Sequence, residues 1–229
     1  MSAREEVLGR IRGALGAGVA VPDVPRDYDG PGAGAAAGDP EVVARFCERA
    51  AEYQATVRRV SAGALADAVA ASLAEHAAVS QRETDAGSFP GGKLPRLRIA
   101  VSPDAPGSGG AAERVADDPP LTPRDLDALD GVLTGCAAAI AETGTVVLDG
   151  GPRSGRRLLT LVPDLHVCVV EAADVHASVP DAIAALAEAA AEGRPLTFVS
   201  GPSATSDIEL ERVEGVHGPR TLVILVVDA

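Results

Sequence analysis

Short apolar runs alternate with longer amphipathic segments along most of this chain. Runs typical of buried strands lie at residues 55–60, 97–102, 130–135, 145–148, 165–170, 196–200 and 222–227. Helical spacing and cap residues predict helices at residues 40–53, 62–76, 136–142, 153–161 and 179–191. Segments rich in Pro, Gly and Asp predict loops at 80–96 and 103–124. Because strands and helices alternate from residue 55 onward, we predict an α/β fold with an open, mainly parallel sheet and helices on both faces.

The first forty residues have a different pattern. Ser2 is a suitable N-cap and Glu5 follows it three residues later, so a helix is predicted from about residue 3 to residue 15. The next segment is rich in Gly, Ala and Pro and has almost no large apolar side chain, which is typical of a flexible linker. The predicted organisation is therefore an N-terminal helix, a flexible linker and one α/β domain, at residues 1–15, 16–39 and 40–229.

Composition and charge exclude several classes of function. Apolar residues make up 46% of the chain but aromatic residues only 2%, so the core must be aliphatic, as is usual for helices packed on a parallel sheet. The formal net charge of −13 argues against a nucleic-acid partner, because phosphate binding needs a concentrated basic surface. The densest basic patch is Arg153, Arg156 and Arg157. It lies either near an anionic ligand or on a solvated helix face.

The cysteines and the apolar runs favour a soluble cytoplasmic protein. Cys47, Cys136 and Cys168 are far apart and form no Cys-x-x-Cys motif, so neither a disulfide framework nor an iron–sulfur cluster is predicted. The charged N-terminal segment is unlike a signal peptide, and no apolar run approaches the ~20 residues of a membrane helix. No Gly-x-Gly-x-x-Gly or P-loop motif is present, so no cofactor is indicated by a recognisable motif.

The most informative segment is residues 201–219, which joins two predicted core strands. Gly201, followed by Pro202, lets the backbone turn sharply off the first strand. Hydroxyl groups and nearby N–H groups after this turn suit a carboxylate or a phosphate, and the hydroxyls come from Ser203, Thr205 and Ser206. The sequence therefore predicts a binding loop for a small carboxylate or a nucleotide-like ligand.

Two carboxylates in the same segment suggest other partners. Asp207 and Glu209 would repel an anion, and they suit a ribose hydroxyl, an amine or a cation instead. The alternative is that residues 206–209 form a capping box, whose serine and glutamate satisfy helix N–H groups. Both interpretations stay open: a loop that only caps a helix, and one that both caps and binds.

His217 is the candidate acid or base. Gly218 and the other small neighbours leave its ring accessible, and an unperturbed pKa of ~6.5 makes it usable at neutral pH. The alternative is a histidine that bonds the backbone of its own turn. A hydrolase triad with Ser203 and Asp207 is possible by residue type, but Ser203 lacks the Gly-x-Ser-x-Gly motif of such enzymes.

Two further segments hold polar candidates. Glu142 ends the predicted helix 136–142, and hydroxyls at Thr143 and Thr145 are close enough in sequence to line the same pocket. His166 and Cys168 alternate on one predicted strand and so face the same side, but no third ligand is evident. No metal site is predicted, and His166 is interpreted as a hydrogen-bonding residue near a strand end.

Four motifs, in this order and spacing, resemble the lactate utilization protein C family, which is built on the LUD domain. They are Ala-Glu-Thr-Gly-Thr at residues 141–145, Pro-Asp-Leu-His at 163–166, the 201–209 segment and Gly-Val-His-Gly-Pro at 215–219. The resemblance covers roughly residues 40–229. It implies an α/β fold similar to that of the sugar-phosphate isomerases and coenzyme A transferases.

The resemblance also implies a role in oxidising L-lactate to pyruvate, beside iron–sulfur partner proteins of the same operon. In coenzyme A transferases of this fold a glutamate is the covalent nucleophile, and the resemblance implies that Glu142 would be its counterpart; a pocket-lining or structural role is the alternative. The candidate catalytic residues are thus Glu142 and His217, expected in one pocket. The candidate ligand-binding residues are Thr143, Gly144, Thr145, Gly201, Pro202, Ser203, Thr205, Asp207, Glu209 and Gly218.

Two other functions stay open. The chain could be a stand-alone enzyme of acyl-transfer or cyclo-ligase type, which would use Glu142 or the 201–219 loop and would bind coenzyme A, ATP or a folate. It could also be a regulatory or scaffolding module whose N-terminal helix docks on a partner.

Overall fold

A computed structural model describes most of the chain, and its main sheet is fully parallel. The described residues are 2–16, 23–32, 34–84, 97–107, 112–205, 213–214 and 218–228. Six strands pair in the order β1-β12-β7-β4-β2-β3, and every neighbouring pair is parallel. They are β1 (Thr56–Ser61), β12 (Thr221–Asp228), β7 (Leu165–Glu171), β4 (Gly131–Gly135), β2 (Arg98–Val101) and β3 (Glu113–Ala116). The predicted open, mainly parallel α/β sheet is confirmed.

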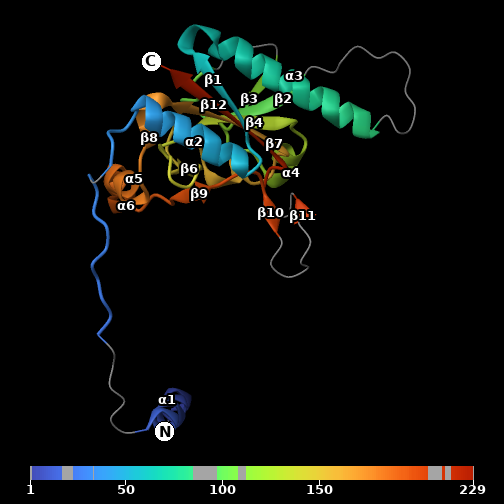
Figure 1. The fold of residues 1–229 in the computed structure, drawn as a ribbon. Coiled ribbons are helices and arrows are strands. Elements are labelled where there is room, and N and C mark those ends of the chain that lie inside the picture. Colours follow the sequence, from blue (N-terminus) through green and yellow to red (C-terminus); the bar gives the residue numbers. More distant parts are fainter. Residues whose placement is uncertain are drawn as a thin grey trace.

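Helices cover both faces of this sheet, as predicted. On one face α3 (Leu65–Thr84) packs through a stripe at four-residue spacing, Leu65, Val69 and Leu73. On the other face α2 (Pro40–Glu52) buries Val42, Val43, Phe46 and Ala50. The two helices lie on opposite sides of the strands in Figure 1. Because both faces are covered, residues 165–170 and 222–227 are all buried, which explains their continuous apolar sequence.

A second, mixed sheet packs on the same face as α2. Its order is β8-β5-β6-β9, and its strands are β8 (Val175–His176), β5 (Ala138–Ile140), β6 (Thr145–Leu148) and β9 (Thr197–Val199). Strands β5, β6 and β9 are antiparallel, whereas β5 and β8 are parallel. The outer face of this sheet is covered by two short helices, α5 (Val179–Ala185) and α6 (Ala187–Ala191), where Ala182 and Leu186 contact Ile140.

The predicted helix at 136–142 is therefore wrong. Its small apolar residues form β5 and a tight turn into β6, and Ala138 to Ile140 are fully buried between two layers. Periodicity alone cannot separate a buried strand from a buried helix in so short a run. The strand expected at 196–200 exists as β9, but it belongs to the second sheet.

Other differences are smaller. The predicted loop at 103–124 contains β3 and the start of α4 (Pro123–Asp127), which a capping box between Thr122 and Asp125 begins. The predicted helix at 153–161 is the short 3-10 helix η3 (Arg157–Thr160), and the one at 179–191 is divided into α5 and α6. The remaining short elements are η1 (Ala62–Ala64), η4 (Ala172–Asp174), β10 (Ala204–Thr205) and β11 (Val213–Glu214).

The N-terminal helix α1 (Ala3–Leu15) is set apart from the other elements in Figure 1. Ser2 and Glu5 form its capping box, and Val7, Ile11 and Leu15 are each at least half exposed. The segment that follows contacts the α/β domain near its end, where the Gly38 N–H donates to Val175 O at 3.0 Å. Within the described part of the chain, no helix combines the length and the apolar character that a membrane span requires.

Candidate functional site

A pocket of about 230 Å³ lies where the main sheet meets the second sheet. His166 on β7 and Leu222 on β12, both near the amino ends of their strands, line one side. The other sides are η3, residues 197–203 and residues 218–219. Open parallel sheets commonly bind ligands at the opposite, carboxyl edge. Here the pocket is found at the amino edge, where Val199 of β9 packs against the core cluster that includes Leu222.

Residues far apart in the sequence converge at this pocket. The Ser203 N–H donates to Pro219 O at 2.8 Å, which joins the two ends of the 201–219 segment. A Cβ placed on Gly218 would lie 3.5 Å from Ser203 Cβ and 3.9 Å from Thr160 O. The predicted Gly201, Pro202, Ser203 and Gly218 therefore all line one pocket.

The predicted threonines are connected to the same pocket by hydrogen bonds but do not line it. Thr145 Oγ1 is hydrogen-bonded to Ser200 Oγ at 2.6 Å and to Thr143 Oγ1 at 2.7 Å. Strands β6 and β9 are antiparallel, with Val146 opposite Val199. This register places Thr145, one residue before Val146, next to Ser200, one residue after Val199. Ser200 lines the pocket, so the two threonines are connected to it through this residue.

Glu142 lies elsewhere. It is exposed in the turn between β5 and β6, and its Oε2 accepts a hydrogen bond of 3.4 Å from the N–H of Val179, the first residue of α5. It is absent from the residues that line the pocket. The described structure thus places the Glu142 carboxylate against the start of α5 and outside the pocket lining.

The glycines Gly144 and Gly201 both press against the carboxyl end of α2. A Cβ on Gly144 would lie 2.5 Å from the carbonyl carbon of Arg49 and still nearer to Ala50 N. A Cβ on Gly201 would lie 3.2 Å from the carbonyl carbon of Tyr53 and nearer to its oxygen. Both glycines have positive φ, 60° and 88°. Close packing against backbone thus explains why these positions need glycine.

Several predicted residues lie outside the described ranges. They include the candidate acid or base His217 and the carboxylates Asp207 and Glu209. The possible capping box at 206–209, the possible triad and the expected proximity of Glu142 and His217 therefore stay predictions. For Thr205 only the backbone pairing of β10 with β11 is described, opposite Val213.

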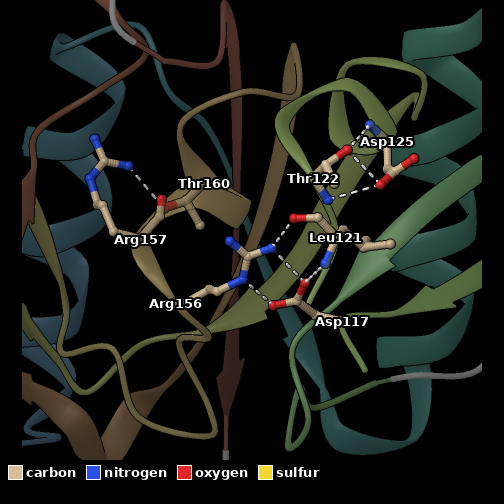
Figure 2. Close-up of polar contacts among 7 residues, drawn as sticks. All are labelled: Asp117, Leu121, Thr122, Asp125, Arg156, Arg157 and Thr160. Atoms are coloured by element: carbon tan, nitrogen blue, oxygen red, sulfur yellow. Dashed lines mark hydrogen bonds and ion pairs between the residues drawn. The ribbon is translucent and has the colours of Figure 1, made fainter. Parts of the chain in front are cut away.

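The three arginines of the basic patch differ in whether a carboxylate binds them. Arg153 donates to Asp174 at 2.8 Å, and Arg156 binds both carboxylate oxygens of Asp117 at 2.5 and 2.7 Å. Arg157 instead donates to the hydroxyl of Thr160 at 3.1 Å, and within the described residues no carboxylate pairs with it. Figure 2 shows Arg156 and Arg157 pointing in different directions from neighbouring positions. Partial burial without a carboxylate partner lowers the pKa of Arg157.

One side of the pocket is lined by a buried polar group. His166 is 2% exposed, and its Nε2 is 2.8 Å from Thr134 Oγ1 on the neighbouring strand. Cys168 is next along the same face of β7, and a hydrogen bond with Cys136, with help from His166, lowers the pKa of the Cys168 thiol against the effect of burial. Among the described residues, no three His, Cys, Asp or Glu side chains gather closely enough to bind a metal.

Arg157, Thr160 and His166 line the pocket but were not among the predicted site residues. The sequence offered two signals for them, the basic patch and the Pro-Asp-Leu-His motif. Neither signal shows which side chains face the pocket.

Comparisons with known proteins agree on one family. A family model described as the LUD domain matches residues 43–227. Lactate utilization protein C of Deinococcus radiodurans is 42% identical over 187 residues, which cover 82% of this chain and 80% of that protein. Lactate utilization protein C of Geobacillus kaustophilus is 32% identical over 117 residues, 48% of each chain. The crystal structure of a DUF162 family protein from Deinococcus radiodurans superposes with a TM-score of 0.63 at 37% identity, covering 82% of this chain and 96% of that one.

Proposed function

Because this chain belongs to the LUD domain family, we propose that it is a component of an L-lactate to pyruvate oxidation system and works beside iron–sulfur partner proteins. The likeness to lactate utilization protein C of Deinococcus radiodurans supports this role, since it extends over most of both chains. We also propose that the chain contributes by binding a small ligand in the pocket between its two sheets.

One observation supports this choice of pocket above others. Parts of three segments that resemble the family motifs line this pocket, at His166, residues 201–203 and residues 218–219. The fourth is connected to it through the hydrogen bond between Thr145 and Ser200. Residues needed only for folding would not have to place hydroxyl groups and a histidine at one opening. The pocket is therefore the part of the fold best suited to a ligand.

Deletion of the gene is expected to abolish growth of the host on L-lactate as sole carbon source. Growth on pyruvate should stay normal, because pyruvate enters metabolism after the proposed step. A plasmid copy of the gene should restore growth on L-lactate. Normal growth of the deletion strain on L-lactate, in a host without a second copy, would contradict the proposal.

The partner proteins need a separate measurement. The tagged chain, purified gently from lactate-grown cells, should bring down protein that contains iron and acid-labile sulfide. Material free of both would remove the iron–sulfur partners from the proposal and leave the growth result unaffected.

Glu142→Gln is expected to restore growth of the deletion strain as well as the natural sequence does. The side chain is exposed, it lies outside the pocket, and its amide oxygen can still accept the single hydrogen bond from the Val179 N–H. Stability should change by less than about 0.5 kcal/mol, as for most surface substitutions. A soluble, folded variant that fails to restore growth would favour the stand-alone acyl-transfer enzyme, whose nucleophile would be this carboxylate.

A further inference from the structure

We propose that the pocket is a site for a small monocarboxylate and that Arg157 binds the carboxylate group. The inference rests on the proposed function only in taking this pocket as the ligand site. The charge, the geometry and the size of the pocket all favour such a ligand.

The charge of the pocket is opposite to that of the whole chain. The formal net charge is −13, yet the described residues that line the pocket include no Asp or Glu, and Arg157 is their one formally charged member. Elsewhere in the described structure, two other half-buried arginines are paired with carboxylates: Arg153 with Asp174 and Arg194 with Asp149. A partly buried guanidinium without a counter-ion is unfavourable by itself, so a bound anion would complete this site.

Neighbouring contacts hold the Arg157 side chain in place. Arg156 fixes the beginning of η3, because it binds Asp117 and also donates to Leu121 O at 2.5 Å. Thr160 accepts from Arg157 Nη1 at 3.1 Å and donates its own hydroxyl proton to Arg157 O at 3.3 Å. Figure 2 shows the contacts of Arg156 with Asp117 and Leu121 and the contact of Arg157 with Thr160. Of the five guanidinium N–H donors, the described contacts use one, which leaves a fork of donors for a carboxylate.

The size and lining of the pocket select the kind of anion. About 230 Å³ is less than the ~300–1,000 Å³ of pockets for drug-sized ligands, so the space suits a molecule of a few carbon atoms rather than a whole coenzyme. One cation matches one negative charge, which disfavours phosphate esters and dicarboxylates. Phe198, Val199 and Leu222 offer apolar contacts, whereas Ser200 and His166 offer polar ones. A short 2-hydroxy or 2-oxo monocarboxylate has both kinds of group.

Titration calorimetry on the purified full chain tests the inference. L-lactate and pyruvate are the probes, with succinate and inorganic phosphate as competitors at constant ionic strength. At least one monocarboxylate should bind more tightly than both competitors. Arg157→Gln should raise the Kd of the bound monocarboxylate about 10- to 100-fold, because a charge-assisted hydrogen bond usually contributes that much to affinity. Arg157→Lys should restore part of the affinity.

Arg220→Gln is the matched control. Arg220 follows a residue of the pocket rim and the substitution removes the same charge, but its side chain is 61% exposed and it pairs with Asp164 at 3.5 Å. Its Kd should stay within about twofold of the natural value, because exposed charges act weakly at a distance. Equal losses in both variants would mean a general effect of charge and would overturn the assignment.

A second measurement uses the natural chain, so it does not depend on the folding of a variant. Modification of Arg157 by phenylglyoxal, followed by peptide mass, should slow when the monocarboxylate is present, and modification of Arg220 should not. No carboxylate binding, tighter binding of phosphate or succinate, or no protection of Arg157 would each overturn the inference. Growth of the deletion strain tests only the pathway, so the proposed function and the carboxylate site can fail independently.

Discussion

Gly144→Ala is expected to lower the free energy of unfolding by about 2–5 kcal/mol, the sum of overpacking and of a strained backbone. The new Cβ would lie 2.5 Å from the carbonyl carbon of Arg49 and nearer still to Ala50 N. These are backbone atoms of α2, so no side-chain rotation can relieve the overlap. The φ of 60° adds the cost of a left-handed conformation for alanine. Against a typical total stability of about 5–15 kcal/mol, this loss is large.

Gly193→Ala is the control that separates the effect of overpacking from the effect of a strained backbone. Gly193 has a similar φ of 73°, but a Cβ there would meet no atom within 4 Å. Only the conformational cost applies, so the loss should be about 1–2 kcal/mol. Urea unfolding of the natural chain and both variants measures the difference. If the two substitutions have the same effect, the tight contact between the β5–β6 turn and α2 is contradicted.

Asp117→Asn is expected to lower the free energy of unfolding by about 2–3 kcal/mol at neutral pH. The carboxylate accepts two hydrogen bonds from Arg156 and one of 2.8 Å from the Leu121 N–H, and its side chain is only 10% exposed. Loss of one partner of a partly buried, charge-assisted pair usually has an effect of this size. The expected loss lies in the lower part of this range because the Arg156 side chain is 34% exposed, so water can solvate its guanidinium after the carboxylate is removed.

The loss of stability caused by Asp117→Asn should become smaller as the pH falls. Burial opposes ionisation of Asp117, but the hydrogen bonds from Arg156 and Leu121 outweigh it, so the pKa lies below the usual 3.8. A carboxyl whose folded pKa is depressed stabilises the fold above its unfolded pKa, and this contribution is lost as the pH falls through the folded pKa. The gap in stability between the natural chain and the variant should therefore be constant above about pH 5 and shrink below about pH 4.

Asp164→Asn is the control for the Asp117 experiment. Asp164 and Arg220 also form an ion pair, but both side chains are more than half exposed. Such surface pairs contribute about 0–1 kcal/mol. Denaturant unfolding from pH 3 to pH 7 compares the variants, and equal losses at the two positions would contradict the special role of the Asp117–Arg156 pair.

The apolar pattern of the sequence was sufficient to predict most of the main sheet. The runs at 165–170 and 222–227 are uninterrupted because both faces of their strands are buried, and few structures other than central parallel strands have that requirement. Where the run was short and made of small residues, at 136–142, the pattern failed. Such a segment fits a helix or a strand equally well, and its contacts with β6 and α2 decided between them.

For the site, residue types and spacing pointed to the 143–145 and 201–219 segments. Described parts of the second segment line one pocket, and Thr145 of the first is connected to it only through a hydrogen bond to Ser200. What only the tertiary structure decided is the role of single residues. Arg156 and Arg157 are neighbours of the same type, yet one pairs with Asp117 and the other faces the pocket. Local sequence sets the backbone preferences of a segment, whereas charge pairing, burial and close backbone approach depend on residues that only folding brings near.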